Sequence, residues 1–151
     1  MLEAASKVTY ELRKAGGGPL TDELRAHYAR CPNIKFLGHL NAHGVASLLS
    51  QAKCSVMPSV CYENNPLGVI ESLCAGTPVV GANIGGIPEL ISADTGIIFE
   101  SGNAEALATS IDMAMSRTWH HPDIKAKSIS RFSPESHLKI LANIYSAATS
   151  E

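Results

Sequence analysis

The amino-acid sequence predicts an α/β fold, a doubly wound parallel sheet of about five strands. Short apolar or β-branched runs alternate along the chain with segments of helical periodicity, as in parallel sheets covered by helices. Two runs, 54–57 and 78–82, read as continuous apolar strands, which is typical of central strands buried on both faces. No repeat, low-complexity tract or linker divides the 151 residues, so we expect one domain.

The first part of the chain predicts a strand, a helix and a second strand. The strand covers 9–15 and is stopped by three glycines and a proline at 16–19. A helix over 21–30 follows, with Thr21 as its cap. The second strand covers 33–37 and ends at Gly38.

The next helix is clearly amphipathic, and the alternation then continues. One face of this helix has i, i+3, i+4, i+7 spacing, and we expect it to be buried: Val45, Leu48, Leu49 and Ala52. Further strands are predicted over 54–57, 78–82 and 96–99, and further helices over 66–75, 104–116 and 134–147. Ser133 and Pro134 are a good cap and first-turn pair for the last helix.

Composition and charge exclude several classes of protein. Twelve Lys and Arg against fourteen Asp and Glu give a net charge of −2, so no basic excess marks a nucleic-acid-binding protein. No apolar run is long enough for a transmembrane span, and the first residues do not form a secretory signal. The four cysteines form no Cys-x-x-Cys pair, and the six histidines lack ligand spacing. We therefore expect reduced thiols in the cytoplasm and no metal site.

Glycines and polar residues follow the predicted strands, where open α/β sheets bind their ligands. Loops at 16–18 and 83–89 and a helix start at Pro66 would offer unpaired N–H groups to an anion. Such glycine turns and an Asn65-Pro66 cap also occur without any binding role. Because Pro66 keeps Asn65 extended, Glu63 belongs to a loop and Glu71 to the second helical turn. Both could then face a ligand that carries hydroxyls.

Four motifs occur along the chain in a distinctive order and spacing. They are Pro58-Ser59, the segment from Glu63 to Glu71, the segment 74–80 and the segment 85–89. Together they resemble the C-terminal, sugar-nucleotide-binding domain of glycosyltransferase family 4, the retaining GT-B enzymes of glycosyl transferases group 1. The flanking segments 15–19, 36–38, 95–99 and 131–133 agree, so the resemblance covers the chain from about Leu2 to Tyr145.

The resemblance implies a role for each matching residue. Glu71 would bind the ribose hydroxyls of the donor nucleotide, and Glu63, the candidate catalytic residue, would position the donor sugar. Backbone near His39 would contact the base, and amides at the start of the 66–75 helix would bind the distal phosphate. The full donor-binding set comprises Glu71, Asn64, Asn65, Leu67, Gly68, Gly16, Gly17, Gly38, His39, Leu40, Pro58 and Ser59. The substrate would be a UDP-, GDP- or ADP-sugar, and no separate cofactor or metal is implied.

The sequence also lacks parts that the family has. Residues 1–151 would form a Rossmann-like donor-binding domain without the N-terminal acceptor domain and without its first strand. An Arg and a Lys that clamp the diphosphate would follow that strand, and neither has an evident replacement. Residues 1–7 then read as the tail of the helix after the absent strand. We expect the remaining strands to close the gap in the order 2-1-3-4-5, or a partner chain to donate the strand, as in a strand-exchanged oligomer.

Three function hypotheses follow from these observations. The first is the donor-binding part of a retaining glycosyltransferase, inactive without its missing half or a second chain. Its parent enzyme would be peripheral to the cytoplasmic membrane. The alternative is a non-catalytic nucleotide-binding or regulatory module that needs a partner chain. A different doubly wound domain, such as a receiver, is disfavoured because the predicted strand ends carry Gly, Pro and Ser in place of an acidic cluster.

Overall fold

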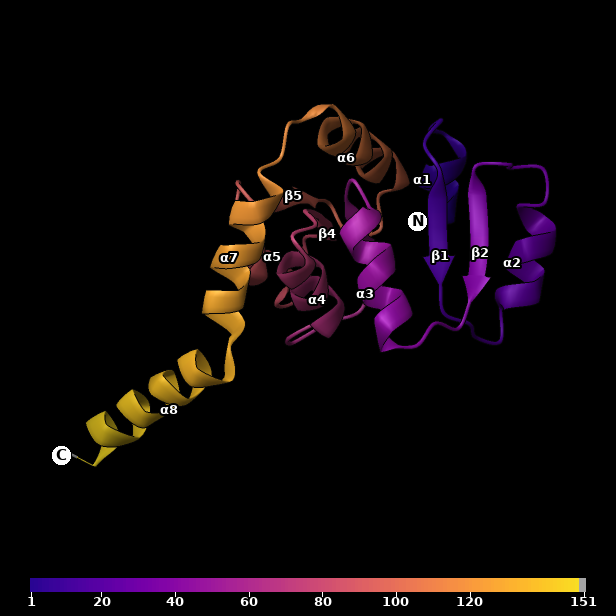
Figure 1. Ribbon diagram of the computed structural model, residues 1–151. Coiled ribbons are helices and arrows are strands. Elements are labelled where there is room, and N and C mark those ends of the chain that lie inside the picture. Colours follow the sequence, from indigo (N-terminus) through magenta and orange to yellow (C-terminus); the bar gives the residue numbers. More distant parts are fainter. Residues whose placement is uncertain (150–151) are drawn as a thin grey trace.

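The computed structural model describes residues 1–149 and consists of parallel strands with helices packed on both faces (Figure 1). All strand pairs in this part of the chain are parallel, so the predicted α/β class is confirmed. The elements in chain order are α1 (Leu2–Ser6), β1 (Leu12–Ala15), α2 (Thr21–His27), β2 (Ile34–Gly38), α3 (Ala42–Gln51), β3 (Ser55–Met57), α4 (Leu67–Ala75), β4 (Val79–Ala82), α5 (Ile87–Leu90), β5 (Gly96–Phe99), α6 (Ala104–Ser116), α7 (His121–Phe132) and α8 (Pro134–Ala148).

The main core surrounds β4, whose four residues are all buried. Helix α4 packs against β3 and β4, and helix α6 packs against β4 and β5. Both helices therefore contribute to the burial of β4. Leu73 of α4 and Leu107 of α6 are fully buried there, so β4 is the central strand that its apolar run predicts.

The strands do not form one sheet. β1 pairs only with β2, and β3, β4 and β5 form a second sheet in that order. The predicted closed order 2-1-3-4-5 is therefore wrong. Helix α1 explains the separation, because Ala4 is buried in the core around β4 while Leu2 and Ala5 are buried with Ile34 of β2. Bringing β1 against β3 would break one of these two contacts.

The first strand begins later than its residues predict. Residues 7–10 form a turn, and β1 starts at Leu12. The side-chain amide nitrogen of Asn33 lies 2.8, 2.9 and 3.3 Å from the carbonyl oxygens of Ala5, Val8 and Tyr10. The backbone of this segment bends so that three carbonyl groups converge on one side chain. A straight strand could not bring these carbonyl groups together.

Two predicted helix caps are also displaced by one residue. Leu20 and not Thr21 is the N-cap of α2, because the Thr21 N–H already donates to the Gly18 carbonyl in a turn. Pro66 is the N-cap of α4 and stays extended, with ψ 108°. In contrast, Ser133 caps α8 as predicted and accepts a hydrogen bond from the Ser136 N–H.

Helices α7 and α8 complete the chain. The sequence analysis did not identify α7, although Pro122 in its first turn is a usual signal for a helix start. α7 packs along α4, whereas α8 leads away from the rest of the molecule (Figure 1). Among residues 1–149, no helix combines the length and the hydropathy that a membrane crossing requires.

Candidate functional site

The predicted ligand-binding residues lie at the carboxyl ends of the strands, as the α/β class requires. Gly16 and Gly17 follow β1, and its neighbour β2 ends at Gly38 before His39 and Leu40. The Gly16 N–H donates to the Gly38 carbonyl at 2.6 Å, so these two loops are joined. Pro58 and Ser59 follow β3 in the same way.

The loop between β3 and α4 carries Glu63 and is tied down at several points. The Ser59 hydroxyl donates to a Glu63 carboxylate oxygen at 3.1 Å. The Ser59 carbonyl in turn accepts a hydrogen bond from the Ser101 hydroxyl, which comes from the loop after β5. Glu63 is half-buried, so its carboxylate is held in a defined place while still reachable from solvent.

Two glycines after β4 fix the backbone of the same loop. The Gly86 N–H donates to the Glu63 carbonyl at 2.6 Å. A Cβ on Gly86 would lie 2.1 Å from the Asn64 carbonyl oxygen, and one on Gly85, where φ is +55°, would lie 2.5 Å from that of Glu63. No side chain fits in this contact, so the Gly-Gly pair is required for the close approach of the two loops.

The start of α4 adjoins this loop. Asn64, Asn65, Leu67 and Gly68 are exposed, and Pro66 provides no side-chain cap. The N–H groups of Leu67 and Gly68 have no partner within the helix, whereas that of Val69 donates to the Pro66 carbonyl at 3.0 Å. The Leu67 and Gly68 N–H groups lie at the positive end of the helix dipole, where an anion is favoured.

Glu71 lies in the second turn of α4, as predicted, and is exposed. It lines a groove of about 710 Å³ between α3 and α4, together with His43 and Lys125. The predicted residues thus fall into three groups: the joined loops after β1 and β2, the Glu63 loop with the start of α4, and Glu71 in the groove. No hydrogen bond within residues 1–149 joins the Glu63 carboxylate to Glu71.

Three further residues gain significance only in the structure. His43 and Lys125 lie beside Glu71, but Lys125 is on α7, which the sequence analysis missed. Lys14, placed inside a strand by its sequence position, extends its ammonium to within 3.3 Å of the Gly16 carbonyl. The Lys14 ammonium therefore reaches the carboxyl end of β1. It does so because the lysine side chain is long, which the periodicity of a strand does not reveal.

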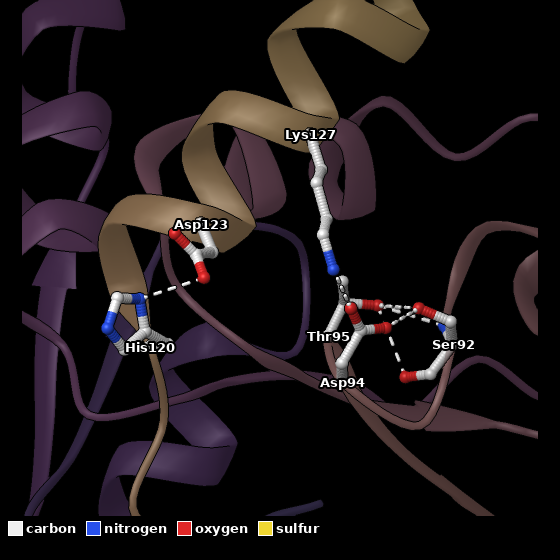
Figure 2. Close-up of polar contacts among 6 residues, drawn as sticks. All are labelled: Ser92, Asp94, Thr95, His120, Asp123 and Lys127. Atoms are coloured by element: carbon white, nitrogen blue, oxygen red, sulfur yellow. Dashed lines mark hydrogen bonds and ion pairs between the residues drawn. The ribbon is translucent and has the colours of Figure 1, made fainter.

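A polar cluster at the opposite edge of the sheet anchors α7 (Figure 2). Lys127 of α7 donates to the Asp94 carboxylate, which also accepts a hydrogen bond from the Ser92 hydroxyl. These two bonds lower the pKa of Asp94 to about 2, and the carboxylate raises the pKa of Lys127. Because this turn precedes β5, it lies at the amino ends of the strands. Its role is to hold α7 in place.

The family follows from the sequence comparison. The profile described as "Glycosyl transferases group 1" matches residues 1–117. The chain belongs to this family. The match includes every residue of both groups around Glu63 and Glu71 except Lys125, and it confirms the resemblance to GT-B glycosyltransferases that the motifs indicate.

The chain spans less than a third of the length of the curated relatives that it matches here. A sulfoquinovosyl transferase of Arabidopsis thaliana is 33% identical over 64% of this chain and 19% of its own length. A GDP-mannose-dependent phosphatidylinositol dimannoside mannosyltransferase of Mycobacterium tuberculosis is 34% identical over 71% of this chain. This chain spans 28% of that enzyme.

Solved structures agree on the fold. The Anabaena protein HepE in complex with UDP matches 97% of this chain with a TM-score of 0.82 and 22% identity. A glycosyltransferase from Rickettsia africae matches 95% with a TM-score of 0.82 and 25% identity. This chain covers 44% and 42% of these two proteins. The fold of this chain is therefore that of GT-B glycosyltransferases.

Proposed function

We propose that this chain is the donor-binding domain of a retaining glycosyltransferase of family 4. It would bind a nucleoside diphosphate sugar while the sugar passes to an acceptor hydroxyl. The family match supports this proposal, and so do relatives whose names include a GDP-mannose-dependent enzyme and whose structures include a complex with UDP. The observation that carries it is the Glu63 loop, clamped between Ser59 and Gly86 beside the start of α4.

The Glu63 carboxylate is suited to hold the hydroxyls of the donor sugar. Its hydrogen bond with Ser59 occupies one carboxylate oxygen, which leaves the other free to accept from a ligand. Asn64 and Asn65 extend the polar surface next to it. A carboxylate fixed in this way orients the sugar before reaction, and orientation is a large part of catalysis in group transfer.

The start of α4 is suited to the diphosphate. The amides of Leu67 and Gly68 would donate to the distal phosphate, with Lys14 adding positive charge from the end of β1. Negative charge develops on the diphosphate as the sugar–phosphate bond breaks, and the aligned amides would stabilise it. In this scheme the reaction needs no metal ion.

Glu71 and the loop after β2 are assigned to the nucleoside. Glu71 would accept hydrogen bonds from the two ribose hydroxyls, and the backbone at Gly38, His39 and Leu40 would contact the base. Gly16 and Gly17, joined to Gly38 by the backbone bond described above, would form the neighbouring wall. The α3–α4 groove with His43 lies next to Glu71 and supports this placement.

We propose that an acceptor-binding half, or a second chain, completes the enzyme and excludes water, so that this chain alone has little transfer activity. We further place it in the cytoplasm, with the whole protein peripheral to the membrane. All four cysteines are free, which is the state that a reducing compartment maintains.

Calorimetric titration with UDP, GDP and ADP tests the donor site. We expect one nucleotide to bind with a millimolar or lower Kd (about −4 kcal/mol or better). Glu71→Ala should weaken this binding by about 10- to 100-fold, because it removes hydrogen bonds to a charged acceptor. Glu23→Ala, an exposed glutamate on α2, is the matched control and should bind as the parent does. Equal loss in both variants, or no binding of any nucleotide, would refute the donor site.

A further inference from the structure

An arginine in the last turn of α7 contacts the carboxyl end of α5. The Arg131 guanidinium donates to the Glu89 carbonyl at 2.8 Å and lies 3.4 Å from the Leu90 carbonyl. These two residues end α5, so their carbonyl groups have no partner within that helix. A cation at this end of a helix also interacts favourably with the helix dipole. Arg131 therefore caps α5, although it lies 42 residues from Glu89 in the sequence.

Helix α5 depends on such a contact because it is very short. It consists of the four residues Ile87–Leu90, and a helix of one turn has little stability of its own. Ile87 and Leu90 are buried in the core around β4. Burial of apolar side chains has no direction, so it does not by itself fix where this turn lies along β4. The hydrogen bonds from Arg131 fix one end of it.

The other end of α5 holds the Glu63 loop. Gly86 is the N-cap of α5, and its N–H is the group that donates to the Glu63 carbonyl at 2.6 Å. Four helical residues span only about 6 Å, and a single turn moves as one body. A shift at the carboxyl end of α5 therefore reaches Gly86, and the position of Glu63 depends on Arg131 through α5.

Helix α7 is itself held in place, so it can support α5. It packs along α4, and a ring nitrogen of His121 lies 2.9 Å from the Gly76 carbonyl at the end of that helix. Further along α7, Lys127 binds the Asp94 carboxylate (Figure 2). α7 is thus fixed at its start and in its middle, and Arg131 near its end extends this support to α5.

We propose that Arg131 is a positioning residue for the donor sugar. By capping α5 it holds the Glu63 loop where the Glu63 carboxylate meets the sugar hydroxyls, and it acts through Gly86. The role toward the sugar rests on the proposed function, whereas the link from Arg131 to Gly86 can be measured without any ligand. Glu71 lies on α4, which packs against β3 and β4, so binding of the nucleoside should not depend on Arg131.

Hydrogen exchange measured by NMR tests the link in the absence of ligand. In Arg131→Met, the Gly86 N–H should exchange about tenfold faster than in the parent chain, because the contact with the Glu63 loop opens more often. The N–H of the buried Val79, which donates to the Thr95 carbonyl at 3.1 Å, reports on global unfolding and should be less affected. An unchanged Gly86 rate, or equal acceleration at both amides, would overturn the proposal.

Calorimetric titration with paired ligands tests the role toward the sugar. The pairs are UDP and UDP-glucose, GDP and GDP-mannose, and ADP and ADP-glucose. For the pair that the parent chain binds, Arg131→Met should lower the affinity for the nucleotide sugar about tenfold and that for the nucleotide less than about twofold. Arg131→Lys keeps the charge and can donate to one carbonyl, so it should restore part of the affinity.

A matched variant shows whether the effect is specific to α5. Arg117→Met makes the same substitution at the end of α6, where the Arg117 guanidinium lies 4.2 Å from the centre of the Trp119 ring. It should change neither the Gly86 exchange rate nor the affinity for the nucleotide sugar. Equal effects of the two Met variants would overturn the proposal, because loss of any arginine near α7 would then suffice.

The two measurements distinguish this inference from the proposed function. If the parent chain binds none of the three nucleotide sugars, the proposed function is refuted, and Gly86 exchange still decides whether Arg131 fixes the loop. If the parent binds one pair and Arg131→Met weakens both members equally, the donor site stands. The positioning role is then refuted, since the loss does not involve the sugar.

Discussion

The contact between Gly86 and the Glu63 loop can be tested by one added methyl group. Gly86 has φ −81° and ψ −2°, which alanine adopts without strain, so Gly86→Ala introduces a clash and no backbone penalty. The new Cβ would lie 2.1 Å from the Asn64 carbonyl oxygen, whereas real Cβ contacts essentially never fall below 3.0 Å. The Asn64 carbonyl would have to move by the difference, 0.9 Å, or more.

This displacement should lower both stability and donor binding. Forcing an extra methyl group into packed surroundings costs about 1–3 kcal/mol. For a domain of this size, that lowers Tm by roughly 2–12 °C. The Glu63 carbonyl, bonded to the Gly86 N–H at 2.6 Å, would move with Asn64. Misplacement of a binding group by 1 Å can reduce function about 100-fold, so we expect nucleotide-sugar affinity to fall at least tenfold.

Thermal unfolding by circular dichroism and calorimetric titration of the same samples measure the two effects. Gly18→Ala is the control for stability, because Gly18 has no positive φ and open space where the Cβ would be; its Tm should match that of the parent. If Gly86→Ala leaves both Tm and affinity unchanged, then the Gly-Gly loop does not fix the position of Glu63. A fall in Tm with unchanged affinity would separate the loop from the donor site.

Three further outcomes are expected. Asn33→Ala should lower the free energy of unfolding in urea by about 1–3 kcal/mol, because it removes the partner of three backbone carbonyls; the exposed Asn83→Ala is its control. Asp94→Asn should destabilise slightly at neutral pH. Because the folded-state pKa of Asp94 is lowered from 3.8 to about 2, this difference should persist above about pH 4 and vanish as pH falls toward 2. Burial raises the pKa of Cys54 to about 11, so iodoacetamide at pH 8 should alkylate the exposed Cys61 well before Cys54, as peptide mapping would show.

Local sequence signals were sufficient for the five strands but not for the exact start of β1 or for helix α7. Alternating apolar runs located all five strands, because burial on both faces demands such runs. The start of β1 was wrong because it depends on Asn33, a residue more than twenty positions away in sequence that binds the 5–10 backbone. α7 was missed because its segment is mostly polar and buries only Ile124 and Ser128.

The candidate site shows the same division between local and distant information. The sequence correctly separated Glu63, in a loop, from Glu71, in a helix, since Pro66 restricts its neighbour. It could not reveal that Gly86 lies against Glu63, because that contact joins the ends of β3 and β4 in space. Nor could it place Lys125 beside Glu71, since α7 must first fold back along α4.

Helix α3 shows that a correctly recognised apolar face need not be fully buried in the structure. Its apolar face predicts a buried layer, yet Leu48, Leu49 and Ala52 are only half-buried in the structure. β3 is likewise half-buried along its length, whereas its neighbour β4 is fully buried. Both half-buried elements line the space between β1 and β3. Burial of an apolar face depends on what packs against it, and within residues 1–149 no strand pairs with β3 on the side away from β4.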